Sequence, residues 1–384
     1  MKYKKVGKIE DTFVYYSSEI NQIYLKSPKK NKKINLKTNQ KSQDSLKITF
    51  LLGSECNAEC KYCYAKEKYI HTNEELYLKN AKILLKNLIV KDGKYSIIFH
   101  GLGEPTLHIN LIQKIIQYIN KFFNNKFTFI IATNGYFNVK VLEFLKNNFN
   151  VVQLSYDGLD NIQKKLRPTN ENTLNFNTIV KTLQDNGVTE CCNTIITDYS
   201  IQFMEKIMYN LHNMGIKYVN LFSVVFNKLT LKNNVTLNYD KYRPLLIGLY
   251  DLADKLNIVL TTDMIFVHRR TPKYCGALSN SIILYPDGLI KSCYRDFSKK
   301  SVFNIAKINK NLIFKKNNYL KLKNFNVENI KNCDDCLIKY NCAGDCPLIN
   351  HELTNDYFKP NKSRCKVRIE FNKDYLMYLA KKLK

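Results

Sequence analysis

Three cysteines with the spacing CxxxCxxC, Cys56, Cys60 and Cys63, form the pattern that points most directly to chemistry. Soft thiolate ligands select iron–sulfur clusters, and three thiolates on one short loop can hold three corners of a cubane. The fourth iron then has no protein ligand, so a substrate or cofactor can bind there. A zinc site, a disulfide and a chance spacing are the alternatives for three cysteines considered alone.

Seven further cysteines form a second group toward the C-terminus. They are Cys275, Cys293, Cys333, Cys336, Cys342, Cys346 and Cys365. The sequence has twelve cysteines, no apolar run long enough to span a membrane and no apolar stretch after its basic N-terminus. We therefore expect a cytoplasmic protein whose cysteines bind metal in a reducing setting, with no membrane partner.

The remaining two cysteines, Cys191 and Cys192, are adjacent within an expected strand. Neighbouring strand residues point to opposite faces, so only one of the two can face the interior of a barrel. One interpretation is a small buried residue, as free cysteine often is. The other is a thiol that gives a hydrogen atom to a substrate radical.

Strand and helix patterns alternate from residue 46 onwards and supply a frame for the first three cysteines. Strands are expected near 47–52, 95–99, 127–131, 150–155, 190–196 and 217–223, and helices at 74–89, 107–123, 137–148, 175–187 and 200–213. Six such units in succession predict parallel strands with right-handed crossovers. Cys56 then follows the C-terminal end of the first strand, where barrels carry their sites.

Polar motifs follow the next strands at the same end of the expected barrel. They are Gly101-Leu102-Gly103-Glu104-Pro105 after the second strand, Thr133-Asn134-Gly135 after the third, and Leu154-Ser155-Tyr156-Asp157-Gly158 after the fourth, with Arg167 soon afterwards. Glycine gives a flexible backbone near a charged ligand, and arginine can pair with a carboxylate as a fork. The motifs thus supply candidate ligand contacts around the cysteine loop.

Together these motifs resemble the radical S-adenosylmethionine (radical SAM) family, in which an aromatic residue, here Tyr62, precedes the last cysteine. The resemblance implies an α/β fold with a partial (β/α)6 TIM-like barrel. It also implies a catalytic 4Fe–4S cluster on Cys56, Cys60 and Cys63 that cleaves S-adenosyl-L-methionine (SAM). Leu102 departs from the family's Gly-Gly-Glu-Pro. The implied SAM contacts are Gly101, Gly103, Glu104, Pro105, Asn134, Ser155, Asp157 and Arg167.

The second cysteine group resembles the SPASM extension of radical SAM enzymes, which holds two auxiliary 4Fe–4S clusters and so brings the implied total to three. The implied ligands are Cys333, Cys336, Cys342 and Cys365 for one cluster, and Cys275, Cys293 and Cys346 for the other. Fully ligated relatives carry one more cysteine shortly before Cys275, and this chain has none there. An open iron, or a ligand from elsewhere such as His268, is therefore expected.

The expected domain organisation has four regions. They are an N-terminal hairpin and basic linker (1–45), the radical SAM partial barrel (46–235), a helical linker (236–270), and the SPASM auxiliary-cluster domain with a C-terminal helix (271–384). Within the first region, strands are expected at 13–16 and 22–25, followed by a linker over 26–41. A β-hairpin with its turn at Pro286-Asp287-Gly288 is expected to bring Cys275 close to Cys293.

The formal net charge of +27 has two interpretations. An acidic partner, either a peptide or a nucleic acid, is the functional one. The other is compositional, because the lysines are spread along a chain that is also rich in asparagine and isoleucine. No RNA-binding module is visible, so a nucleic-acid partner is not favoured.

The resemblance implies an enzyme that modifies a ribosomally made peptide, with a flavodoxin or ferredoxin-type protein as reductant. Thioether crosslinking is the leading expectation, because a peptide cysteine could bind an open auxiliary iron. The alternatives are formylglycine formation, epimerisation, carbon–carbon crosslinking, nucleic-acid modification and a non-catalytic iron–sulfur scaffold. In formylglycine-forming relatives an aspartate base follows the cysteine after the hairpin. Here Tyr294 stands in that place and Asp296 lies two residues further on.

Overall fold

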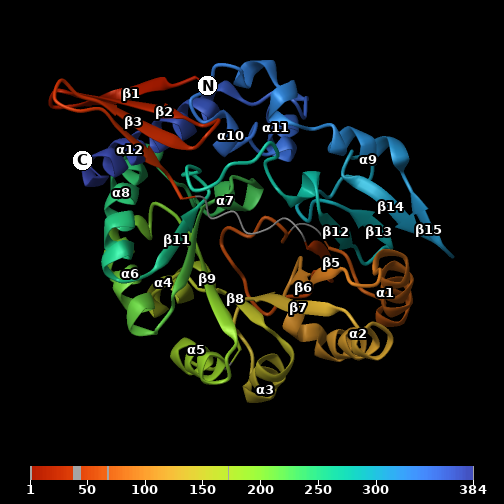
Figure 1. Cartoon of the computed structure of the whole chain (residues 1–384). Helices are drawn as coiled ribbons and strands as arrows, with labels where there is room; N and C mark the ends of the chain where they lie inside the picture. The colour runs from red at the N-terminus through yellow and green to blue at the C-terminus, as the bar shows by residue number, and fades with distance from the viewer. Residues whose placement is uncertain (1, 38–44, 67–68, 172, 384) are drawn as a thin grey trace.

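The computed structural model describes residues 2–37, 45–66, 69–171 and 173–383. Parallel strands curve into a partial barrel with helices on its outside (Figure 1). The barrel strands in these residues are β5 (Leu46–Leu52), β6 (Lys94–Gly101), β7 (Lys126–Thr133), β8 (Val151–Ser155), β9 (Thr189–Ile196), β10 (Tyr218–Ser223) and β11 (Val259–Thr262). The predicted α/β partial barrel is confirmed, and the six predicted strands correspond to β5–β10.

Helices connect the successive barrel strands, as the βα pattern predicts. They are α1 (Glu74–Leu88), α2 (Ile109–Phe122), α3 (Val139–Asn148), α4 (Asp160–Leu166), α5 (Phe176–Asp185), α6 (Met204–Asn213), α7 (Lys228–Lys232) and α8 (Tyr239–Lys255). Asparagine caps the N-termini of several of them; Asn73, for example, accepts a hydrogen bond from the N–H of Leu76.

The prediction of a helical linker over 236–270 was wrong in its second half. Helix α8 fills the first half, but β11 follows it and pairs in parallel with β10, from Tyr218–Val259 to Leu221–Thr262. The barrel therefore has a seventh strand. With four residues, β11 is too short for its hydrophobic pattern to be distinguished from a loop in the sequence.

The C-terminal region extends the barrel sheet rather than starting a separate one. Its strands are β12 (Ser281–Leu284), β13 (Leu289–Lys291), β14 (Asn304–Ile308) and β15 (Leu312–Phe314). Strand β12 pairs in parallel with β5, from Ser281–Lys47 to Leu284–Phe50. The strand order of this sheet in the described residues is β11-β10-β9-β8-β7-β6-β5-β12-β13-β14-β15. The predicted β12–β13 hairpin is present, and it lies beside the strand that leads to Cys56.

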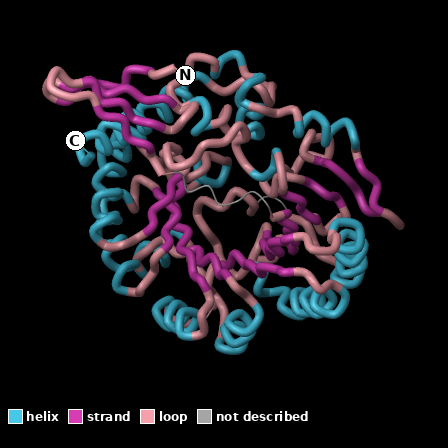
Figure 2. The backbone as a smooth tube through the Cα atoms, in the orientation of Figure 1, coloured by secondary structure: helices cyan, strands magenta, loops and turns pink. Residues whose placement is uncertain are grey.

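Helices α9 (Lys316–Lys323), α10 (Lys339–Cys342), α11 (Pro347–Thr354) and α12 (Lys362–Leu383) complete the C-terminal region. The N-terminal segment packs against α12 as a four-stranded antiparallel sheet (Figures 1 and 2). Its strands are β1 (Lys4–Ile9), β2 (Thr12–Ser17), β3 (Gln22–Lys26) and β4 (Lys32–Asn35). The prediction of a single hairpin missed β1 and β4, because their lysines mask a strand pattern. Residues 38–44, at the end of the predicted linker, lie outside the described residues.

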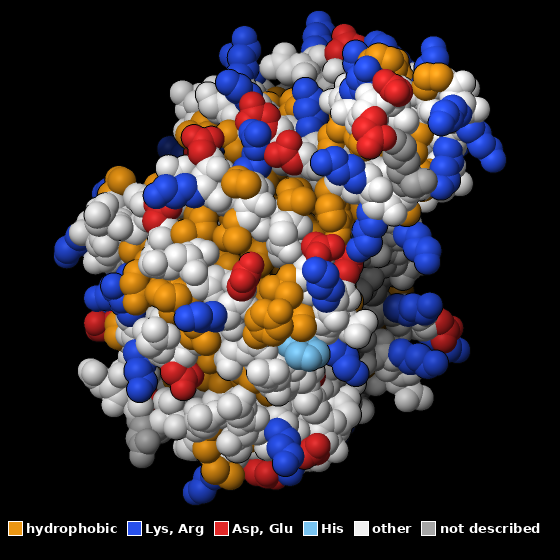
Figure 3. Space-filling model, turned by 90° about the vertical axis from the view of Figure 1, so that its left-hand side faces the viewer, with side chains coloured by type: hydrophobic (Ala, Val, Ile, Leu, Met, Phe, Trp, Pro, Cys, Tyr) orange, Lys and Arg blue, Asp and Glu red, His pale blue; other side chains and the backbone are white. Residues whose placement is uncertain are grey.

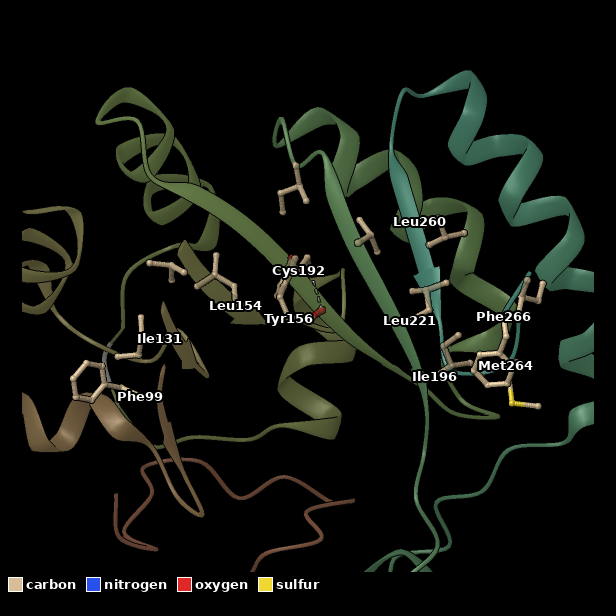
Figure 4. Close-up of a cluster of buried hydrophobic side chains, with 14 of the residues drawn as sticks. Phe99, Ile131, Leu154, Tyr156, Cys192, Ile196, Leu221, Leu260, Met264 and Phe266 are labelled. Carbon is tan, nitrogen blue, oxygen red and sulfur yellow. Dashed lines mark hydrogen bonds between the residues drawn. The ribbon is translucent and has the colours of Figure 1, made fainter. Parts of the chain in front are cut away.

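Alternation of side chains along the barrel strands separates a helix-facing core from the inner face of the barrel. Figure 4 shows Phe99, Leu154, Cys192 and Leu221 among the core side chains contributed by successive strands. Cys192 is fully buried there, and its thiol donates to the carbonyl oxygen of Tyr156 at 3.3 Å. Cys192 is therefore the structural cysteine of the pair, and Cys191 points to the opposite face.

The distribution of surface charge and the length of the helices are relevant to two partners considered for this chain, a nucleic acid and a membrane. On the face shown in Figure 3, Lys and Arg side chains are scattered among acidic and uncharged ones instead of forming one patch. This distribution fits the compositional interpretation of the net charge. No helix in the described residues is long and apolar enough to cross a membrane.

The core beneath the cysteine loop gives a stability prediction. Phe50 is fully buried on β5, and its ring stacks on Phe99 with 5.5 Å between centroids. We expect Phe50→Ala to lower the free energy of unfolding by about 3–5 kcal/mol, because it removes apolar contacts and leaves a cavity. Urea unfolding followed by circular dichroism measures this.

The matched control is Phe314→Ala, since Phe314 is exposed at the end of the edge strand β15. Its free energy of unfolding should change by no more than about 0.5 kcal/mol. Equal destabilisation by the two substitutions would contradict the assignment of Phe50 to the core.

Candidate functional site

The cysteine loop, residues 53–66, begins at the C-terminal end of β5 and is held by backbone hydrogen bonds from the segment after α4. The N–H of Glu59 donates to the carbonyl of Pro168 at 2.7 Å, and the N–H of Lys61 donates to the carbonyl of Leu166 at 2.8 Å. The Thr169 hydroxyl donates to the carbonyl of Asn57 at 2.6 Å. These bonds fix the loop from one side over the whole span of Cys56, Cys60 and Cys63.

The glycine turn after β6 holds the loop from the other side. Two backbone N–H groups, of Gly103 and Glu104, donate to the carbonyls of Gly53 and Glu55 at 3.0 and 2.8 Å. A Cβ at Gly103 would lie 1.9 Å from the Glu55 carbonyl oxygen, so only glycine permits this approach. Leu102, the departure from the family pattern, is buried in a small core instead.

Glu104 joins the glycine turn to the turn after β7. Its carboxylate accepts from the Thr133 hydroxyl at 2.6 Å and from the N–H of Asn134 at 2.7 Å, and it is almost fully buried. Burial raises the pKa of Glu104, although the hydrogen bonds from Thr133 and Asn134 favour its charged form. The predicted contact of Glu104 with SAM stays a prediction; in the structure this carboxylate fixes two strand-end turns relative to each other.

Asn134 contacts the cysteine loop directly. Its side-chain N–H donates to Asn57 Oδ1 at 2.9 Å and lies 3.9 Å from Cys56 Sγ. Asn57 in turn donates to the carbonyl of Tyr136 at 2.7 Å. The turn after β7 therefore places an amide donor beside the first cysteine of the loop.

Asp157, Tyr62 and Arg167 form a buried network behind the loop. The Tyr62 hydroxyl donates to Asp157 Oδ2 at 2.5 Å, and Arg167 Nε donates to the same oxygen at 3.2 Å. The Arg167 guanidinium also lies 5.1 Å from the centre of the Tyr62 ring. Asp157 is fully buried, so its carboxylate orients Tyr62 and Arg167, while Ser155 at the end of β8 stays partly exposed. The predicted SAM contacts of Ser155, Asp157 and Arg167 stay predictions.

The structure brings the predicted ligands of the first cluster together. Burial raises the pKa of Cys60 to about 12, and the charges of Cys63 and Cys56 add to the shift. Without metal the Cys60 thiol therefore stays protonated at neutral pH. Iron binding would release the proton, because thiolate is the ligand form. Cys56 is exposed and is therefore accessible to iron.

The ten predicted cysteines fall into the three sets expected from the sequence. Burial raises the pKa of Cys293 to about 12, and the nearby charges of Cys346 and Cys275 raise it further. Burial also raises the pKa of Cys333 to about 12, and neighbouring thiols again add to the shift. Those neighbours are Cys336, Cys342 and Cys365. Cysteines from distant parts of the chain therefore meet in two C-terminal sets.

Arginines surround the C-terminal sets. Arg368 is buried and lies 3.9 Å from Cys342 Sγ. It pairs with Asp345, which also accepts from Arg364 Nε at 3.0 Å. A buried guanidinium beside thiols stabilises negative charge on sulfur, so this environment suits thiolate ligands.

Comparison with known proteins identifies the barrel. Residues 51–199 match the radical SAM superfamily. This chain contains a radical SAM domain. The uncharacterized protein MJ0907 of Methanocaldococcus jannaschii is 28% identical over 282 residues, which cover 68% of this chain and 91% of that protein.

Solved structures share the fold of the radical SAM domain and of the C-terminal region. The structure of anSMEcpe with bound AdoMet and Cp18Cys peptide matches with a TM-score of 0.69 and 20% identity, covering 88% of this chain and 100% of that chain. SuiB of Streptococcus suis bound to precursor peptide SuiA matches with a TM-score of 0.60 and 17% identity, covering 84% and 76%. The predicted resemblance is thus confirmed at the level of family and fold.

The contacts of His268 in the structure are with tyrosines, and its suggested role as a ligand of the hairpin cysteines stays a prediction. Its Nε2 lies 2.8 Å from the Tyr375 hydroxyl, and its ring contacts Tyr250 and Tyr375. Within the described residues, no group of three or more His, Cys, Asp or Glu side chains is arranged to hold a single metal ion.

A small apolar core joins the radical SAM domain to the C-terminal region. It contains Leu51 and Leu102 from the barrel and Ile283 and Tyr285 from the hairpin, with Cys63 and Tyr64 packed against it. Burial raises the pKa of Tyr64, and its electrostatic neighbours include both Cys63 and Cys293. Tyr64 therefore lies between the first cysteine set and the hairpin set.

Sequence analysis missed Arg295 at this junction; for His100, which flanks the glycine motif, the sequence left a contact with the cofactor and a structural role open. The Arg295 guanidinium lies 5.7 Å from the centre of the Tyr64 ring, and the His100 ring stacks on Tyr294 at 5.1 Å. Neither belongs to a motif. The alternation along β6 is the signal that could have singled out His100, because it places this residue on the inner face of the barrel.

The close approach at Gly103 yields a prediction about the cysteine loop. Gly103→Ala should displace the loop, because the new methyl group overlaps the Glu55 carbonyl. We expect anaerobically reconstituted protein to lose about four irons, the content of one cubane cluster. Iron analysis with electron paramagnetic resonance measures the loss.

Gly248→Ala is the control, since nothing lies within 4 Å of a Cβ at that position in α8. Its iron content should equal that of the unsubstituted protein. Full iron content in Gly103→Ala would show that the loop does not depend on this contact.

Proposed function

We propose that this chain is a radical SAM maturase that oxidatively modifies a ribosomally made peptide, most specifically by forming a thioether crosslink. The observation that supports the proposal is the closeness of the cysteine loop to the hairpin cysteines, with Tyr64 near both Cys63 and Cys293. Peptide-bound anSMEcpe and SuiB share the fold, which supports a peptide as substrate. A flavodoxin or ferredoxin-type protein is the proposed reductant.

When bound, the first 4Fe–4S cluster and SAM would supply a 5′-deoxyadenosyl radical that removes a hydrogen atom from an unactivated carbon. Cys56, Cys60 and Cys63 would hold this cluster. Hydrogen bonds from the glycine turn and from Asn134 hold the cysteine loop in place. Asp157, which is paired with Arg167, orients Tyr62. This chain's contribution is positioning and exclusion of water around the reacting carbon.

The C-terminal sets would hold two auxiliary clusters, and the hairpin set favours thioether formation. That set, Cys275, Cys293 and Cys346, offers three thiols. The acidic residues next to them in sequence are already paired: Asp345 with two arginines, and Asp296 with Lys291 at 3.3 Å. In this proposal a cysteine of the peptide would take the fourth ligand position.

Formylglycine formation is the second candidate, and the hairpin loop argues against it. Tyr294 stands where the corresponding base would be an aspartate. Asp296 cannot substitute for that base, because it is almost fully buried, pairs with Lys291 and accepts from the N–H of Ser298. Nucleic-acid modification is not favoured either, because the cationic side chains on the face in Figure 3 are scattered.

The direct test uses anaerobically reconstituted protein with SAM, dithionite and a cysteine-containing peptide such as Cp18Cys. We expect release of 5′-deoxyadenosine and a peptide lighter by about two daltons per crosslink, because two hydrogens leave. Liquid chromatography with mass spectrometry measures both products. A Cys56→Ala variant should give neither.

Three outcomes separate the candidates. A mass loss that resists thiol alkylation indicates a thioether. A peptide aldehyde would indicate formylglycine formation instead. Failure of the reconstituted protein to release 5′-deoxyadenosine under any condition would contradict the proposed function as a whole.

A further inference from the structure

His100 lies on the inner face of the barrel, beside the junction of the two regions. Along β6, Tyr95, Ile97 and Phe99 are buried on the helix side, and Figure 4 shows Phe99 among them. His100 points the other way, is partly exposed and pairs in register with Leu51 of β5. Leu51 belongs to the small core that packs against Cys63 and Tyr64.

The hydrogen bonding of His100 defines which ring nitrogen can accept a proton. Its Nδ1 lies 2.8 Å from the carbonyl oxygen of Gly101. A carbonyl only accepts, so Nδ1 carries the hydrogen and Nε2 is the basic nitrogen. Nε2 has no hydrogen-bond partner among the described residues. Burial lowers the pKa of His100, so the ring is neutral at pH 7.

Tyr294 and Arg295 complete this cluster from the C-terminal side. The Tyr294 ring stacks on His100 with an interplanar angle of 29°, and Tyr294 directly follows Cys293. The Arg295 Nε is buried without a hydrogen-bond partner in the described chain. A neutral base stacked on Tyr294 and a guanidinium whose Nε has no hydrogen-bond partner in the described residues therefore lie near the hairpin, and together they suit a group that loses a proton and becomes an anion.

We propose that His100 Nε2 accepts the thiol proton of a substrate cysteine as its sulfur enters the space beside Cys293, with Tyr294 positioning the imidazole and Arg295 facing the thiolate. The step is R–SH + imidazole → R–S⁻ + imidazolium, and no electron moves in it. This inference rests on the proposed function and specifies how that site takes up the cysteine. Arginine beside sulfur favours the thiolate, and a buried base within reach removes the proton.

The test uses a small thiol, N-acetylcysteine amide, and the reconstituted holoprotein. Calorimetry in buffers of different ionisation enthalpy gives both the affinity and the number of protons released. At pH 7 we expect the unsubstituted protein to release almost no proton, because His100 keeps it. His100→Asn should release about one proton and bind about tenfold more weakly.

Raising the pH separates proton transfer from a structural role. Above the ordinary thiol pKa of about 8.5 the probe is already a thiolate. The difference in affinity between the unsubstituted protein and His100→Asn should then shrink, because a local base no longer helps a probe that is already ionised, whereas a purely structural defect would keep the affinity low at every pH. His100→Gln serves as the second variant if His100→Asn does not fold.

His212→Asn is the matched control, because His212 lies on the outer helix α6, with Nδ1 3.1 Å from the carbonyl oxygen of Leu256. It should behave like the unsubstituted protein. Equal proton release by the unsubstituted protein and the His100 variants would overturn the inference. Protein that cleaves SAM but binds no thiol at any pH would overturn it too, while leaving the radical SAM activity intact. Absence of SAM cleavage would instead contradict the proposed function.

Discussion

The parallel pairing of β12 with β5 is the contact on which the arrangement of this molecule depends. Strand β5 leads directly into the cysteine loop, and β12 leads through the hairpin to Cys293. Because the two strands share a ladder of hydrogen bonds, the two cysteine sets are fixed relative to each other by one sheet. The small core around Leu51 and Tyr285 fills the space between them.

Several polar groups near the cysteine loop are already paired with other barrel residues. The Glu104 carboxylate accepts a hydrogen bond from the turn after β7, and the Asp157 carboxylate accepts hydrogen bonds from Tyr62 and Arg167. These bonds hold the cysteine loop rigid. In contrast, the hydrogen bond of His100 in the described residues is made by Nδ1, and Arg295 Nε is buried there without a partner. A rigid frame with a few unpaired polar atoms facing one space is the arrangement expected of a site that positions a substrate.

Much of this could be predicted from the sequence, for physical reasons that apply to particular residues. The alternation of apolar strands and helices gave six barrel strands, and the cysteine spacings grouped ten thiols into the three sets that the structure brings together. The β5–β12 pairing could not be predicted, because neither strand carries a signal for its partner. Strand β11 was missed because it has four residues, and β1 and β4 because lysines dominate them. The hydrogen bond of His268 to Tyr375 could not be predicted, because nothing in the sequence links these two residues.

The central claim is that one continuous sheet holds the cysteine loop after β5 close to the hairpin cysteines, and that each of the three cysteine sets can bind an iron–sulfur cluster. An anomalous difference map at the iron absorption edge, from crystals of anaerobically reconstituted protein, tests it most directly. The account predicts three separate iron peaks, one at each cysteine set, with Tyr64 between the peak at Cys63 and the peak at Cys293. A map with iron at the Cys56–Cys63 loop alone, or with no iron beside Cys293, would contradict it.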